Sequence, residues 1–110
     1  MKLITKVIMD KLQANHKLDM EDKSNEELPL KLFNASGGQT WLIHSIEEDG
    51  DIMWGLADLG FGCVEYGTIS LKEMEECQRT MGYRFMLERD RCWSGGKVED
   101  FQGRTNLGGC

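Results

Sequence analysis

Apolar residues recur at helical spacing near the start of the chain. Val7, Ile8 and Leu12 share one face of a helix at this spacing. Thr5 just before them is a residue type that caps helix N-termini, because its hydroxyl accepts a hydrogen bond from a free backbone amide. The pattern predicts a helix that runs from Thr5 to about residue 15.

A polar stretch over residues 16–27 separates this helix from the next apolar segment. Acidic residues outnumber lysines in it, which is typical of an exposed connection. Pro29, the only proline, then precedes a short apolar segment over residues 30–34. This segment is predicted to be extended, and the glycines at 37–38 indicate a turn after it.

Three segments with the composition of β-strands follow one another closely. The first, over residues 39–47, is rich in tryptophan, leucine and isoleucine, and Asp49-Gly50 after it is typical of a tight hairpin turn. The next two segments cover residues 51–58 and 63–69, with a glycine-containing turn between them. Consecutive strands joined by short turns imply an antiparallel meander.

A second helix is indicated by the residues that open it. Ser70 and Glu73 have the spacing of a capping box, in which each side chain bonds to the backbone amide of the other. The helix is predicted to run to about residue 80 and to stop at Gly82. Residues 83–89 form a last strand or an extended arm.

The predicted fold is therefore α+β. It is an antiparallel β-meander of four to five strands, packed by an N-terminal helix and by a second helix near residues 70–80. Residues 1–93 are predicted to form a single domain. Residues 94–110 carry five glycines and few apolar side chains, so they are predicted to be a Gly-rich, loosely ordered tail.

Net charge limits the classes of partner. At −6, the chain is poorly suited to broad nucleic-acid binding, which needs Lys and Arg to neutralise phosphates. No apolar run approaches the roughly 20 residues that span a bilayer. The start of the chain also lacks the apolar core and cleavage site of a signal peptide. The sequence predicts a cytoplasmic protein that does not bind membranes.

Cysteine spacing argues against a metal centre. None of the four cysteines forms a C-x-x-C pair or has a histidine close by in the sequence, so zinc-site spacing is missing. Free thiols, buried or half-buried in a reducing compartment, are expected instead. No metal site and no cofactor are predicted. The cysteines are Cys63, Cys77, Cys92 and Cys110.

A series of short motifs occurs in a fixed order along the chain. They are LITK at Leu3, KLF at Lys31, TW at Thr40, DGD at Asp49, WGL at Trp54, EYG at Glu65, SLKEMEE at Ser70 and ERD at Glu88. In this order and spacing, the chain resembles domain-of-unknown-function family 2958, small proteins of bacteria, plasmids and phages. The resemblance implies no specific activity. It implies a setting on mobile genetic elements, and therefore a host or defence protein as the class of partner.

Four alternating charges, Glu88 to Arg91, follow the apolar part of the predicted last strand. A carboxylate pair beside arginines can perform acid–base chemistry or hold an anion. The alternative function is thus a small-ligand or nucleotide-handling enzyme, with Glu88 and Asp90 as acid–base groups and Arg89 holding the anion. Strand alternation places Arg89 on the side opposite to both carboxylates. That favours cross-strand ion pairs, with partner docking as a third interpretation.

Large apolar residues occupy both faces of the predicted sheet. Trp41 and Leu42 are neighbours on one strand and point to opposite faces, as do Met53 and Trp54. The two helices cover one face. The other face needs a second cover, which can be a second copy of the chain, a partner, or the tail.

We therefore expect a non-enzymatic protein-interaction module of a phage or plasmid, with interference in host defence as its role. The partner is predicted to be another protein, or a second copy, bound through an apolar sheet face. An enzyme would instead need a pocket in which Glu88, Arg89 and Asp90 converge. The predicted binding residues are Trp41, Trp54, Glu65, Tyr66, Arg89 and Asp90.

Overall fold

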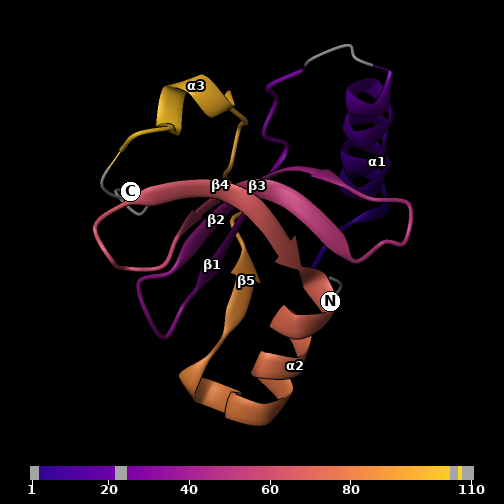
Figure 1. Ribbon diagram of the computed structural model, residues 1–110. Coiled ribbons are helices and arrows are strands. Elements are labelled where there is room, and N and C mark those ends of the chain that lie inside the picture. Colours follow the sequence, from indigo (N-terminus) through magenta and orange to yellow (C-terminus); the bar gives the residue numbers. More distant parts are fainter. Residues whose placement is uncertain (1–2, 22–24, 105–106, 108–110) are drawn as a thin grey trace.

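Five antiparallel strands and two longer helices make up the fold, which is α+β as the sequence predicts (Figure 1). The computed structural model describes residues 3–21, 25–104 and 107 of the chain. The spatial order of the strands is β4-β3-β2-β1-β5. The elements are α1 (Lys6–Met20), β1 (Leu30–Asn34), β2 (Thr40–Ile46), β3 (Ile52–Asp58), β4 (Val64–Ser70), α2 (Leu71–Met81), the 3-10 turn η1 (Gly82–Arg84), β5 (Leu87–Arg89) and α3 (Val98–Phe101).

The predicted meander is formed by β2, β3 and β4. At the β2–β3 turn, Gly50 has a φ of 71°, a conformation that glycine adopts without steric cost. Asp49 Oδ1 accepts hydrogen bonds from the backbone amides of Asp51 and Ile52. The turn chemistry therefore fixes where β3 starts, and the β3–β4 pairing then runs without a register shift.

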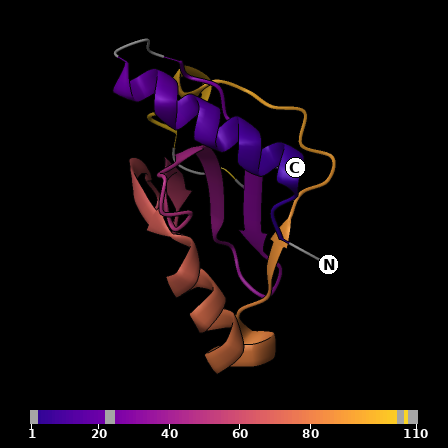
Figure 2. The ribbon, with the colours of Figure 1, turned by 90° about the vertical axis from the view of Figure 1, so that its right-hand side faces the viewer.

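The chain crosses the sheet between its last two strands. α2 starts at the end of β4, and the chain then returns as β5, which pairs with β1 at the opposite edge (Figure 2). Ser70 Oγ accepts a hydrogen bond of 3.2 Å from the amide of Glu73, so the predicted N-cap of α2 is confirmed. Residues 83–89 are predicted to be either a last strand or an extended arm. Within them, Leu87–Arg89 form a strand.

α1 continues to Met20, beyond the end that the sequence predicts near residue 15. Charged residues after Asn15 suggested an exposed connection, but charge alone does not end a helix. No glycine or proline interrupts the stretch from Asn15 to Met20. Asp19, in the last turn of α1, contacts the sheet, which gives this extension of the helix a packing role.

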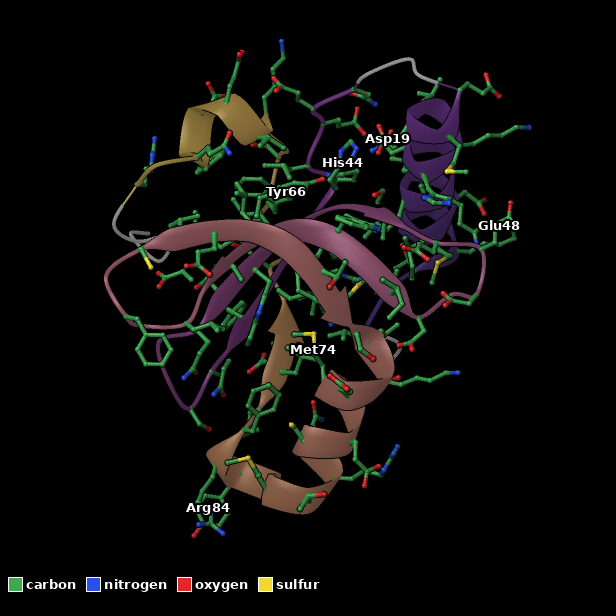
Figure 3. All side chains as sticks on the ribbon, viewed as in Figure 1. Asp19, His44, Glu48, Tyr66, Met74 and Arg84 are labelled. Carbon is green, nitrogen blue, oxygen red and sulfur yellow. The ribbon has the colours of Figure 1, made fainter. Side chains whose placement is uncertain are left out.

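Apolar side chains form two clusters, one on each face of the sheet. The first lies between the sheet and the helices α1 and α2, and Met74 is the buried residue of α2 in it (Figure 3). The second lies between the sheet and the C-terminal segment. The buried members of the second cluster are Leu28, Leu42, Leu56, Val64, Val98 and Leu107.

The C-terminal segment differs from the loosely ordered tail that the sequence predicts. Val98 is 9% exposed and Leu107 is 7% exposed, and both pack on the second face of the sheet. Trp93 Nε1 donates a hydrogen bond of 2.7 Å to the carbonyl of Leu28. Residues 105–106 and 108–110 lie outside the described residues. The chain itself therefore supplies much of the second cover.

Asp51 ties the β2–β3 turn to the start of α2. Its Oδ1 accepts hydrogen bonds of 2.8 Å from the amide of Lys72 and from Ser70 Oγ. The backbone hydrogen bond from Lys72, followed by the bond from Ser70, lowers the pKa of the Asp51 carboxyl below its ordinary value of 3.8. The ionised carboxylate is therefore the form that the folded state prefers.

We expect Asp51→Asn to lower the melting temperature at pH 7. Because the pKa of Asp51 is lower in the folded state, its ionised form stabilises the fold above about pH 3.8. That contribution is lost as the pH falls through the lowered folded pKa. The difference in melting temperature between wild type and Asp51→Asn should therefore shrink below pH 3.8 in thermal scans by circular dichroism. Glu48→Gln, at an exposed position in the same turn, is the control, and a pH-independent difference would contradict the assignment.

Candidate functional site

A charged hollow lies between the start of α1, α2 and β5. It measures about 760 Å³, and Glu88 and Arg89 line it. Asp90 lines a separate hollow together with Arg89, without Glu88, and its Oδ2 lies 3.5 Å from Lys31 Nζ. Arg89 Nη1 donates a hydrogen bond of 3.1 Å to the carbonyl of Leu3. The three residues of the predicted enzymatic site thus do not converge on one pocket.

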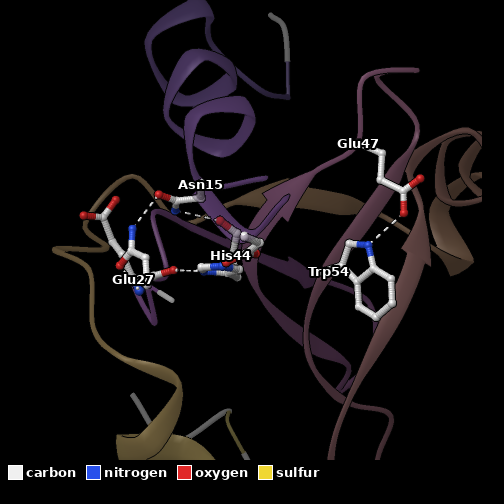
Figure 4. Close-up of polar contacts among 7 residues, drawn as sticks. Asn15, Glu27, His44, Glu47 and Trp54 are labelled. Atoms are coloured by element: carbon white, nitrogen blue, oxygen red, sulfur yellow. Dashed lines mark hydrogen bonds and ion pairs between the residues drawn. The ribbon is translucent and has the colours of Figure 1, made fainter. Parts of the chain in front are cut away.

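A buried histidine stands at an irregularity in β2. The β2–β3 register shifts between Ile43 and Ser45, and His44 between them is 2% exposed. Its Nδ1 lies 2.6 Å from the carbonyl oxygen of Glu27 (Figure 4). Its Nε2 lies 2.9 Å from Asp19 Oδ2. With both ring nitrogens engaged, His44 does not activate Ser45, whose buried hydroxyl has no hydrogen-bond partner among the described residues.

The polar contacts around His44 join α1 and the segment after it to the sheet. Asn15 Nδ2 donates a hydrogen bond of 2.8 Å to the carbonyl of His44. Asn25 Nδ2 donates in turn to Asn15 Oδ1, at 2.7 Å. These bonds satisfy backbone and side-chain groups in an enclosed position, where unpaired polar groups would be costly. The histidine therefore has a structural role.

Trp41 lies in the core, and this corrects its assignment to the binding face. It is 6% exposed, and its ring meets that of Phe85 edge-on, with the ring centroids 6.2 Å apart. Trp41 belongs to the cluster under α1 and α2. In the folded chain it is covered by helices and cannot contact a partner.

Trp54 and Tyr66 form an aromatic pair on neighbouring strands. Their ring centroids lie 6.3 Å apart, and Trp54 Nε1 donates a hydrogen bond of 2.8 Å to Glu47 Oε2 (Figure 4). Tyr66 is 41% exposed and lies on the side of the molecule that carries His44 and Asp19 (Figure 3). Partial burial, followed by the charge of Asp19, raises the pKa of Tyr66 above 10.0. Its phenol therefore stays neutral at physiological pH.

β4 is an edge strand, and among the described residues its outward backbone groups are unpaired at Tyr66 and Thr68. In an antiparallel pair, successive residues bond alternately to the neighbouring strand and away from it. The amide of Leu71 bonds to the carbonyl of Asp51, and the amide of Val64 bonds outside the sheet to the carbonyl of Arg104. The alternation therefore points the amides and carbonyls of Tyr66 and Thr68 outward. Among the described residues, no hydrogen bond reaches these groups.

The opposite edge of the sheet is protected by the chain itself. β5 has three residues, and Gln78 Oε1 accepts a hydrogen bond of 3.2 Å from the amide of Leu87 at its start. Such covering is one way in which proteins prevent unwanted strand pairing. β4 has seven residues, no lysine and no proline, and its outer side is largely exposed. The two edges thus differ in protection. Among the described residues, β4 is the edge whose outward backbone groups, at Tyr66 and Thr68, remain available for pairing.

Three of the six predicted binding residues lie on neighbouring strands, but strand alternation points the side chain of Glu65 to the face opposite that of Tyr66. Trp54, Glu65 and Tyr66 lie on β3 and β4, and Glu65 is exposed beside Cys63, whose Sγ lies 3.8 Å from Glu65 Oε1. Arg89 lies on β5 at the opposite edge, with Asp90 directly after it.

The backbone edge at Thr68 is a feature that the sequence predictions do not include. Its signal is a run of seven strand residues, from Val64 to Ser70, without the lysine or proline that commonly protects an edge.

Metal and membrane sites are not supported within the described residues. There, no group of three or more His, Cys, Asp and Glu side chains is placed to hold a metal ion. No helix of the described chain combines the length and apolarity needed to cross a bilayer. Cys63, Cys77 and Cys92 are free as predicted, but they are exposed rather than buried, and Cys110 lies outside the described residues.

The fold and the site define a small α+β protein with one protected and one open sheet edge. The chain belongs to the family of proteins of unknown function DUF2958, whose sequence profile matches residues 3–98. A search of curated proteins gives no match, and a search of solved structures also gives none.

Proposed function

We propose that this protein is a non-enzymatic protein-interaction module that binds through the outer edge of β4. An extended segment of the partner would add to β4 as a further strand. The observation that carries this proposal is the pair of outward-pointing, unpaired backbone positions at Tyr66 and Thr68. Backbone hydrogen bonds would provide affinity, and side-chain contacts beside them would provide selectivity.

Aromatic side chains beside the edge support the proposal. Trp and Tyr dominate binding hot spots, because they bury a large area and lose few rotamers. Tyr66 is itself an edge residue, and Trp54 packs against it from β3. Phe61, in the turn before β4, is also exposed. A partner strand would therefore meet apolar contacts along with the free backbone groups.

Two classes of partner can supply such a strand. One class is a host or defence protein, which the setting on phages and plasmids implied by the resemblance suggests and whose activity the module would block. A second copy of the chain is the other class. Both would use the same backbone groups, so one substitution tests the edge in either case.

Thr68→Pro should weaken partner capture at least about tenfold, which corresponds to about 1.4 kcal/mol or more. The substitution removes the outward amide and places a ring on the edge. Because this amide is not part of the β3–β4 ladder, the fold should tolerate proline, as edge strands commonly do. The measurement is retention, on immobilised protein, of host-lysate proteins and of a tagged second copy, followed by mass spectrometry.

Thr68→Val is the matched control, since it keeps the amide and the β-branched shape. It should retain the same proteins as the wild type. Circular dichroism must show that Thr68→Pro is folded. A folded Thr68→Pro variant that retains every partner at the wild-type level would contradict the proposal.

A further inference from the structure

We infer that the strand added to β4 is β4 of a second copy of this chain, paired antiparallel about a two-fold axis at Gly67. This inference rests on the proposed function and names the occupant of the edge. The two copies would form one continuous antiparallel sheet. Such an isologous interface uses the same surface on both subunits, so the edge must be complementary to itself.

In the register with its axis at Gly67, the two unpaired positions, Tyr66 and Thr68, pair only with each other. An axis at Gly67 places Tyr66 opposite Thr68 of the second copy, and Thr68 opposite Tyr66. Both residues point their amides and carbonyls outward, so the two pairs can form about four hydrogen bonds. An axis at Tyr66 would require Val64, whose amide already bonds to the carbonyl of Arg104. An axis at Thr68 would require Ser70, where the chain turns into α2.

Side chains also fit the axis at Gly67. The two axial residues would form a pair without hydrogen bonds, in which the Cα atoms approach to roughly 4.5 Å. A Cβ added to Gly67 would have no atom within 4 Å, so the position is open toward solvent. In this register Glu65 faces Ile69 of the second copy, which avoids a pair of like charges. Tyr66 faces Thr68, an aromatic and β-branched pair that stabilises sheets.

Within the part of the chain that the structure describes, the edge at Tyr66 and Thr68 is open to a second copy. β4 forms the outer border of the sheet, and α2 turns back from its end toward β5 on the other side (Figures 1 and 2). The C-terminal segment bonds to β4 at Val64, its first residue. The opposing effect is repulsion between two chains of net charge −6, which salt screens beyond about 8 Å at physiological ionic strength. Association should therefore be measured in about 0.15 M salt.

Opposite charges at position 67 provide a test that is specific for this axis. Gly67→Glu would place two carboxylates against each other across the axis, and Gly67→Lys would place two ammonium groups there. Each variant alone should self-associate at least tenfold more weakly than the wild type. An equimolar mixture should form the mixed dimer, because one carboxylate then meets one ammonium group. Gly67→Ser is the uncharged control and should dimerise.

Sedimentation over a micromolar to sub-millimolar concentration series measures these equilibria. A concentration-dependent wild-type dimer, with pairing restored only in the mixture, supports the inference. A wild-type dimer that persists in Gly67→Glu, or a mixture that stays monomeric, overturns the Gly67 axis. A wild type that stays monomeric, while Thr68→Pro still loses captured partners, overturns self-pairing and leaves the proposed function standing. If Thr68→Pro also has no effect on capture, the proposed function fails as well.

Discussion

Gly55→Ala should destabilise the protein by about 3 kcal/mol or more, the upper end of the cost of overpacking. A Cβ built on Gly55 would lie 2.2 Å from the carbonyl oxygen of Leu42 and 2.9 Å from the Cα atom of Ile43. Both are backbone atoms of β2, so no change of rotamer relieves the contact. β2 is irregular here, because its register with β3 shifts just after Ile43. The added methyl group would force the two strands apart.

Gly67→Ala is the matched control, since Gly67 lies directly across from Gly55 in the β3–β4 pairing. No atom lies within 4 Å of its added Cβ, and its φ is not positive. The substitution should change stability by less than about 1 kcal/mol, in the stabilising direction, because it reduces the entropy of the unfolded chain. Urea unfolding at low micromolar concentration measures both variants. Wild-type stability in Gly55→Ala would contradict the close approach of β2 and β3.

Local chemistry is sufficient to predict most of the meander. Asp49-Gly50 specifies a turn through side-chain hydrogen bonds and a positive φ, and Ser70 specifies where α2 begins. These signals act within a few residues, so they can be recognised in the sequence. The alternation of apolar residues likewise indicates correctly that both sheet faces are apolar, with Trp41 on one face and Leu42 on the other.

Long-range contacts are the part of the fold that local patterns did not reveal. The contact between Asp19 and His44 joins residues far apart in the sequence, and nothing near either residue indicates it. The place of β5 beside β1 depends on where α2 delivers the chain. The C-terminal segment was misjudged because Val98 and Leu107 are isolated apolar residues among glycines and charges, so composition concealed their shared cluster.

The same difference between local and long-range contacts explains why only part of the candidate site could be predicted. Trp54 and Tyr66 lie on consecutive strands of a hairpin, and their contact follows from local pairing. Alternation alone does not say which face the helices cover, so Trp41 was assigned to the wrong environment. Strand order is a non-local property, so the sequence could not place Arg89 at the edge opposite to β4.

Val98→Asp should release the C-terminal segment from the sheet and cost roughly 3 kcal/mol, because it places an unpaired carboxylate in an apolar cluster. Val98 packs with Leu42 and Leu56, and Leu107 joins them while its amide donates a hydrogen bond of 2.9 Å to Asp58 Oδ2. Release would expose this face while the cluster under α1 and α2 stays packed. We therefore expect increased binding of a hydrophobic dye with little loss of helical signal.

Leu107→Ala is a second variant that should also lower the stability of the protein, since truncating a buried leucine typically costs about 2–5 kcal/mol. Glu99→Ala is the matched control, because Glu99 is exposed on the same short helix as Val98 and its loss should stay within about 0.5 kcal/mol. Dye fluorescence and urea midpoints distinguish the variants. If Val98→Asp and Leu107→Ala both kept wild-type stability and dye binding, the segment would contribute nothing as a cover. The second face would then require a partner or a second copy, and the binding surface would have to be sought there instead of along the edge of β4.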